Sequence, residues 1–213
     1  MSRADPGPRV PVTVVDYGAG NLVSIEQALT AAGAIVRRAS RASGIGEPAL
    51  LVVPGVGASA PAMARLRAGG FEPAILEWVA ADRPFLGICL GLQLLFETSD
   101  EDEARTLGVL RGHTVRLQDA PTLPHIGWNQ VELRRHHRAF AGIADGSDFY
   151  FVHSYAGAPD DDDVVLAETE HGGRFTAAVA RGRLLGVQFH PERSGADGLR
   201  LIANVVRLAA EAA

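Results

Sequence analysis

The chain has 213 residues, of which 47% are hydrophobic and 21% are charged, and these values are ordinary for one globular domain. The net charge of -5, without a basic stripe of interleaved aromatic residues, argues against nucleic acid as a partner. No apolar run reaches the roughly 18 residues of a membrane helix, and the single cysteine excludes an intramolecular disulfide. We therefore expect a cytoplasmic protein with a disordered tail over residues 1–9 and one domain over residues 10–213.

The N-terminal half of the chain alternates short apolar strands with helical patterns. Strands are predicted at residues 10–15, 35–38, 50–53 and 85–88, and helices at residues 22–29, 61–67, 73–81 and 90–97. This alternation is typical of βαβ units, in which helices cover both faces of a buried parallel sheet.

The C-terminal half changes character, because strand-like segments follow one another with only turns between them. They lie at residues 114–117, 129–133, 147–152, 164–168, 175–180 and 184–189, and a helix over residues 198–210 closes the chain. The predicted fold is therefore α/β, with a mostly parallel central sheet flanked by helices and an additional mixed or antiparallel strand region. Two acidic runs, at residues 100–103 and 160–163, are expected to be solvated turns.

The only cysteine stands in the sequence Gly87-Ile88-Cys89-Leu90-Gly91, after a strand and before a helix. This spacing is typical of a nucleophile elbow, in which glycines relieve crowding around a sharp turn. A helix N-terminus also favours the thiolate form of the nucleophile. The alternative is a buried cysteine that packs as a small hydrophobe.

A histidine and a carboxylate follow the last predicted strand, in the sequence His190-Pro191-Glu192. Residues i and i+2 of an extended chain lie on the same side, so Glu192 could orient the imidazole while His190 takes a thiol proton. A surface turn is the alternative for these three residues alone. The order Cys, His, Glu differs from the order of an α/β-hydrolase triad.

A second glycine-flanked loop, at residues 54–58, follows the third strand. Peptide N–H groups of such a loop can bind a charged oxygen. Val56 or Gly57, together with the N–H of Leu90, could therefore form an oxyanion hole.

The motifs Gly-Ile-Cys-Leu-Gly-Leu-Gln (residues 87–93) and Gly-Val-Gln-Phe-His-Pro-Glu (residues 186–192) resemble those of the class I, triad-type glutamine amidotransferases. The resemblance extends from about residue 12 to the C-terminus. It implies that Cys89 attacks the side-chain amide of glutamine, that His190 is base and then acid, and that Glu192 orients it. It also implies that the glutamine is held by Gly55, Gln93, Ser154 and Tyr155.

Four further segments, at residues 16–21, 54–58, 124–129 and 150–155, resemble the glutaminase subunits of imidazole glycerol phosphate synthases. That resemblance implies a heterodimer with a separate (β/α)₈ cyclase subunit, which receives the ammonia in histidine biosynthesis. The residues then expected on the partner face are Asn21, Trp128, Asn129, Tyr150 and Arg193. We expect no cofactor and no metal, because none of the seven histidines has metal-ligand spacing to a second ligand.

Three alternatives stay open on the sequence alone. One is the glutaminase subunit of another synthase, of the anthranilate or pyridoxal phosphate type. Another is a peptidase or deglycase-like enzyme with a cysteine elbow, which His190-Pro191-Glu192 disfavours. The last is a non-catalytic regulator that kept the fold, which the presence of all three triad residues disfavours.

Overall fold

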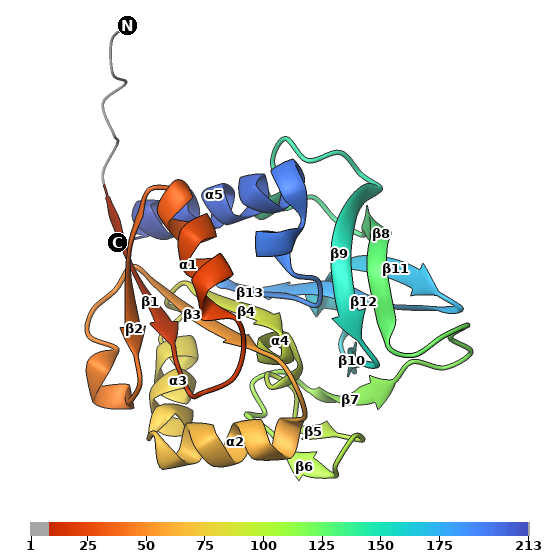
Figure 1. Cartoon of the computed structure of the whole chain (residues 1–213), viewed down its shortest axis with the longest axis horizontal. Helices are drawn as coiled ribbons and strands as arrows, with labels where there is room; N and C mark the ends of the chain where they lie inside the picture. The colour runs from red at the N-terminus through yellow and green to blue at the C-terminus, as the bar shows by residue number, and fades with distance from the viewer. Residues whose placement is uncertain (1–8, 213) are drawn as a thin grey trace, which may run out of the picture.

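The computed structural model describes residues 9–212, and nine strands of this part form one central sheet in the order β2-β1-β3-β4-β13-β12-β11-β8-β9 (Figure 1). Residues 1–8 of the predicted tail lie outside the described residues, and Arg9 is exposed without regular structure. The strands are β1 (Val10–Val15), β2 (Ala34–Ala39), β3 (Leu50–Gly55), β4 (Phe85–Cys89), β8 (His125–Leu133), β9 (Ser147–His153), β11 (Val165–His171), β12 (Gly173–Arg181) and β13 (Leu184–Val187).

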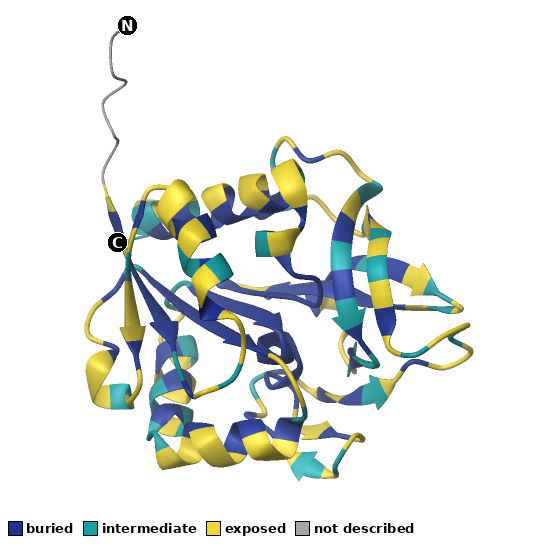
Figure 2. Ribbon diagram, in the orientation of Figure 1, coloured by how far each residue is buried: buried dark blue, intermediate teal, exposed yellow. Residues whose placement is uncertain are grey.

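The half of the sheet from β2 to β13 is parallel, as the alternation of strands and helices predicts. Helices α1 (Leu22–Ala31) and α5 (Gly195–Ala212) cover one face, and α2 (Ser59–Ala68) and α3 (Phe71–Ala80) cover the other. Every residue of β3 and β4 is buried between these layers (Figure 2). The continuous apolar runs of these strands follow from this burial on both faces.

The other half of the sheet is antiparallel, which confirms the mixed region predicted from the C-terminal sequence. A second sheet of four strands lies beside it in the order β10-β7-β5-β6. These strands are β5 (Thr98–Ser99), β6 (Ala104–Arg105), β7 (Gly112–Arg116) and β10 (Tyr155–Pro159). In residues 9–212, no helix combines the length and the apolar character that crossing a bilayer requires.

The helix predicted over residues 90–97 is wrong in its second half, because α4 spans only Leu90–Gln93. The next carbonyl groups bond to a distant segment instead of continuing the helix. The amide of Leu107 donates to Leu94 O at 2.9 Å, and the amide of Gly108 donates to Phe96 O at 2.7 Å. The apolar run by itself predicts a longer helix, whereas these tertiary hydrogen bonds end it after one turn.

Candidate active site

Cys89 is the last residue of β4 and stands immediately before α4, with a φ of 53°. A positive φ is strained for a residue with a side chain, so the surrounding packing must hold it. The two flanking glycines allow that packing. A Cβ atom on Gly91 would lie 1.8 Å from Val53 O, and one on Gly87 would lie 2.6 Å from Gly91 O. The glycine spacing thus does what the sequence predicted, since it permits a sharp turn that presents the sulfur.

The neighbouring strand brings His190 to the same edge of the sheet. Strand β13 runs parallel to β4 with Val187 opposite Ile88, so the chain leaves β13 beside the cysteine turn. His190 Nδ1 lies 2.9 Å from Glu192 Oε1, and both side chains are buried. Burial lowers the pKa of His190, but the attraction of Cys89 and Glu192 for the charged ring outweighs it and raises the pKa to about 10. The imidazole therefore stands between a sulfur and a carboxylate that both favour its charged form.

Ser194 fixes the backbone around this histidine, a role that the sequence did not reveal. Its hydroxyl donates to His190 O at 2.6 Å and accepts from the amide of Tyr150 at 2.9 Å. The amide of His190 also donates to Tyr150 O at 2.9 Å. These bonds tie the turn η4 (Pro191–Arg193) to β9 and so set the direction of the imidazole.

A cavity of about 220 Å³ opens beside Cys89 and contains most of the predicted oxyanion and substrate residues. Those that line it are Val56, Gly57, Leu90, Gln93, Ser154 and Tyr155. Gly57 has a φ of +92°, a conformation that glycine adopts without strain. Gly55 lies opposite Cys89 in the sheet register, and a Cβ atom there would lie 2.1 Å from the hydroxyl of Tyr17. The loop at residues 54–58 and the cysteine turn are therefore adjacent, as an oxyanion hole would require.

Two residues beside Cys89 or its cavity had no predicted site role. Gln188 is fully buried, and its Nε2 donates to Cys89 Sγ at 3.6 Å. A polar residue inside the apolar run before His190 is the only signal in the sequence that could have found it. Glu101 belongs to an acidic run that we expected to be a plain solvated turn. It is exposed, but it also lines the cavity.

Of the residues predicted for a partner face, Trp128, Tyr150 and Arg193 come together as one surface group. Trp128 is opposite Tyr150 in the β8–β9 pair, and their rings meet edge to face at 6.2 Å. The guanidinium of Arg193 lies 4.3 Å above the Tyr150 ring. The Trp128 side chain is 56% exposed, which is unusual for so large an apolar group. We call these three residues the aromatic patch.

The two predicted asparagines behave differently from the aromatic patch. Asn21 is exposed at the start of α1, where its amide donates to Ser24 Oγ at 3.2 Å. Asn129 is half-buried and donates to Glu170 O at 2.8 Å. The side chain of Asn129 is thus bonded to the neighbouring strand β11.

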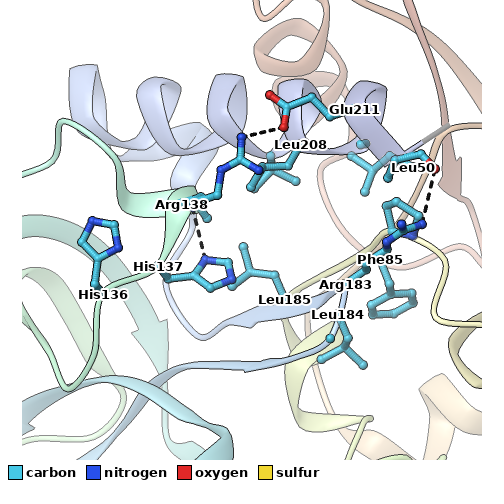
Figure 3. Close-up of a pocket in the computed structure, with 16 residues that line it drawn as sticks. Leu50, Phe85, His136, His137, Arg138, Arg183, Leu184, Leu185, Leu208 and Glu211 are labelled. Atoms are coloured by element: carbon cyan, nitrogen blue, oxygen red, sulfur yellow. Dashed lines mark hydrogen bonds and ion pairs between the residues drawn. The ribbon is translucent and has the colours of Figure 1, made fainter.

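A cavity of about 430 Å³ lies at the opposite end of the parallel strands and holds none of the predicted site residues (Figure 3). Leu50, Phe85 and Leu184, the first residues of β3, β4 and β13, line it. Arg138 closes one side through an ion pair with Glu211. Ligands of open α/β sheets bind at the carboxyl ends of the strands, which is the Cys89 edge.

The described residues contain no group of three His, Cys, Asp or Glu side chains that could hold a metal ion. The groups at the Cys89 edge are a buried thiol, an imidazole and a carboxylate, beside peptide N–H groups. Such a set performs nucleophilic attack on a carbonyl carbon.

Comparison with known proteins gives matches over nearly the whole chain. A family model described as glutamine amidotransferase class-I matches residues 13–208. The chain is 43% identical to imidazole glycerol phosphate synthase subunit HisH of Dehalococcoides mccartyi, over 93% of this chain and 97% of that protein. It is 45% identical to the subunit of the same name from Moorella thermoacetica, over 91% and 93%. A crystal structure of a glutamine amidotransferase superposes with a TM-score of 0.74 at 22% identity, covering 93% of this chain and 98% of that one, which shows the shared fold.

Proposed function

This chain belongs to the class-I glutamine amidotransferases and, within them, to the HisH subunits of imidazole glycerol phosphate synthase, and we propose that Cys89, His190 and Glu192 are its glutaminase triad. The observation that carries the proposal is the Glu192–His190 contact of 2.9 Å beside the strained cysteine turn. The names of the relatives favour this synthase over the anthranilate and pyridoxal phosphate types that the sequence left open.

The reaction follows from the order of these groups. Cys89 Sγ attacks the side-chain carbonyl carbon of glutamine, and the thiol proton is held by His190 Nε2. This nitrogen is buried and has no hydrogen-bond partner among residues 9–212, so it is open to receive and pass on a proton. His190 then protonates the leaving nitrogen, ammonia departs, and a glutamyl thioester remains. Water then attacks the thioester carbonyl carbon while His190 takes one of its protons. The C–S bond breaks, glutamate leaves, and His190 returns that proton to sulfur.

Backbone N–H groups stabilise the oxyanion of each tetrahedral intermediate. Leu90 follows the nucleophile at the start of α4, and Val56 and Gly57 line the facing side of the cavity. The glycines of the loop at residues 54–58 permit a peptide flip. Binding of the cyclase subunit and of its nucleotide ligand can therefore populate the loop conformation in which a peptide N–H points at the oxyanion. Glu101 lines the same cavity, and in this proposal its carboxylate accepts a hydrogen bond from the α-ammonium group of glutamine, while Gln93, Ser154 and Tyr155 hold the rest of the substrate.

The ammonia is delivered to a separate (β/α)₈ cyclase subunit that binds over the aromatic patch, with Asn21 and Asn129 at its margin. An exposed tryptophan beside a stacked arginine and tyrosine has the composition of an interface hot spot. The thiolate chemistry requires a reduced Cys89, so the heterodimer belongs in the cytosol, where thiols stay reduced.

Glutamate release from glutamine tests the triad directly. We expect activity with the cyclase subunit and its nucleotide ligand present, and loss of that activity in Cys89→Ala. Activity that persists in Cys89→Ala would remove the nucleophile from the proposal. Cys89-dependent activity that ignores the cyclase would keep the glutaminase and reject this partner. A thiol that resists a glutamine-mimicking alkylating agent would favour a non-catalytic regulator.

A further inference from the structure

We propose that His125, His153 and Gln188 are positioning residues in one hydrogen-bonded chain that couples strand β8, beside the aromatic patch, to Cys89. This hydrogen-bonded chain is continuous and buried over most of its length, and most of its members have no role in the triad chemistry. The inference rests on the proposed function, because it concerns how a partner bound over the patch would influence the nucleophile.

The first half of the hydrogen-bonded chain starts at Asn129 on β8, next to Trp128 in the sequence. Asn129 Nδ2 lies 3.4 Å from His125 Nε2. His125 Nδ1 lies 3.3 Å from His153 Nε2, which joins β8 to β9 through their side chains. His153 Nδ1 lies 2.8 Å from Tyr155 O, at the wall of the glutamine cavity.

The second half of the hydrogen-bonded chain runs from the same carbonyl group, Tyr155 O, to Cys89. Gln93 Nε2 donates to Tyr155 O at 2.7 Å and to Gln188 Oε1 at 3.0 Å. Gln188 Nε2 in turn donates to Cys89 Sγ at 3.6 Å. Five side chains and one backbone carbonyl thus connect the surface strand to the sulfur.

The central acceptor, Tyr155 O, determines which ring nitrogens of His153 and His125 carry a hydrogen. A backbone carbonyl only accepts, so His153 Nδ1 must carry a hydrogen and its Nε2 must be the acceptor. His125 must then donate through Nδ1 and accept at Nε2, which agrees with an amide donor at Asn129. Asn129 is oriented independently, because its Nδ2 donates to Glu170 O at 2.8 Å and its Oδ1 accepts from the amide of Gln130 at 2.9 Å.

The two halves both donate to Tyr155 O, so the chain cannot pass a proton from end to end. It can only transmit position. Its two histidines and Gln188 are buried, with exposed fractions of 4% for His125, 7% for His153 and 0% for Gln188. Breaking one bond would leave a buried group unsatisfied, which favours movement of the chain as a unit.

Burial keeps both histidines neutral, as the chain requires. Desolvation lowers the pKa of His125 to about 4, with a further contribution from His171, whose ring stacks on it at 4.0 Å. Desolvation also lowers the pKa of His153 to about 3; the bond to Tyr155 O opposes this shift, and His125, His190 and His171 add to it. A charged His153 would place two N–H groups against each other at His125 and break the chain.

The competing explanation is that the histidines only pack, since His125 also stacks on Phe151 at 5.1 Å. His125→Phe preserves an aromatic ring in that stack and removes both hydrogen bonds. His171→Phe is the matched control, because it alters the same stack outside the chain. Both variants are compared with the wild type as complexes with the cyclase subunit, by measuring kcat and KM for glutamine with and without the nucleotide ligand.

We expect His125→Phe to lower the ratio of stimulated to basal kcat about tenfold with little change in KM, within the range of known site-to-site couplings. His171→Phe should keep the wild-type ratio. An unchanged ratio of stimulated to basal kcat in His125→Phe, or an equal loss of this ratio in both variants, would contradict the proposed coupling through the hydrogen-bonded chain. The glutaminase proposal would still stand. A wild-type complex that releases no glutamate would overturn the proposed function and this inference with it.

A second measurement needs no variant and guards against misfolding. Nitrogen NMR of the imidazoles of the wild-type protein reports which ring nitrogen carries the hydrogen. We expect His125 and His153 both as neutral Nδ1–H tautomers at neutral pH. Either ring found as the Nε2–H tautomer would contradict the donor order and overturn the proposal.

Discussion

The carboxylate of Glu192 lies 2.9 Å from Nδ1 of His190, and both side chains are almost fully buried. The opposite ring nitrogen, Nε2, has no hydrogen-bond partner among the described residues. Glu192 therefore selects the tautomer and the direction of the ring, while Nε2 is left for the proton that the reaction moves.

The Glu192–His190 contact predicts a large loss of rate in Glu192→Gln. The amide oxygen or nitrogen can still bond to the ring, but it no longer stabilises the imidazolium. We expect kcat for glutamine hydrolysis to fall about 10²- to 10⁴-fold. Glu211→Gln, which removes an exposed carboxylate on α5, should leave kcat unchanged. Equal kcat values in wild type and Glu192→Gln would exclude an orienting role.

The cysteine turn predicts a steric requirement for glycine at position 91. A Cβ atom at Gly91 would lie 1.8 Å from a backbone oxygen of β3, which cannot yield without moving the central sheet. We expect Gly91→Ala to lower the free energy of unfolding by about 3 kcal/mol. Gly44→Ala is the control, because its new methyl group would be in ordinary contact with Ala39 at 3.5 Å. Urea denaturation measures both; two equally stable variants would contradict the close approach.

The two buried histidines of the hydrogen-bonded chain, His125 and His153, predict a loss of stability in acid. Burial lowers the pKa of His125 to about 4 and that of His153 to about 3, from an unfolded value of 6.5. Below pH 6.5 the unfolded chain therefore binds more protons than the folded protein, so the free energy of unfolding falls as the pH drops toward 4. His190, with a pKa raised to about 10, is charged in the folded protein throughout this range and in the unfolded protein well below pH 6.5, so it adds little to the slope there.

The pH dependence of denaturation measures this effect, and His153→Phe provides the comparison. One histidine contributes up to about 1.4 kcal/mol per pH unit between the two pKa values, so the variant should show a shallower slope between pH 6.5 and pH 4. Parallel slopes for the two proteins would mean that His153 titrates alike in the folded and unfolded states.

The aromatic patch predicts where partner affinity is concentrated. Trp128→Ala removes a large exposed ring and should weaken binding of the cyclase subunit about 30-fold, as loss of an interface hot spot does. Ile35→Ala is the control, because Ile35 is also exposed but lies on the edge strand β2. Calorimetric titration gives both dissociation constants. Unchanged binding by Trp128→Ala would place the interface elsewhere.

The position of Glu101 predicts a substrate role for one member of an acidic turn. Glu101→Gln removes the negative charge that would face the α-ammonium group, and we expect KM for glutamine to rise about tenfold with kcat preserved. Glu103→Gln, in the same turn but outside the cavity lining, should behave as wild type. A KM that rises equally in both would indicate a general effect of charge.

Several features could be predicted from the sequence because their causes are local. The apolar runs that became β3 and β4 reflect burial on both faces, and the glycines around Cys89 reflect the turn itself. The His190–Glu192 pair also depends on short-range geometry, since the two residues stand two positions apart. The motifs that carry the family resemblance are of this local kind.

Only the tertiary structure decided the features that depend on distant segments. Helix α4 ends after Gln93 because of hydrogen bonds from residues 107–110, and no local sequence pattern predicts this end. Gln188 and Gln93 meet across 95 positions of sequence, and His125 meets His153 only because β8 pairs with β9. Periodicity identifies which residues are buried, but strand order and register decide which buried polar groups find each other.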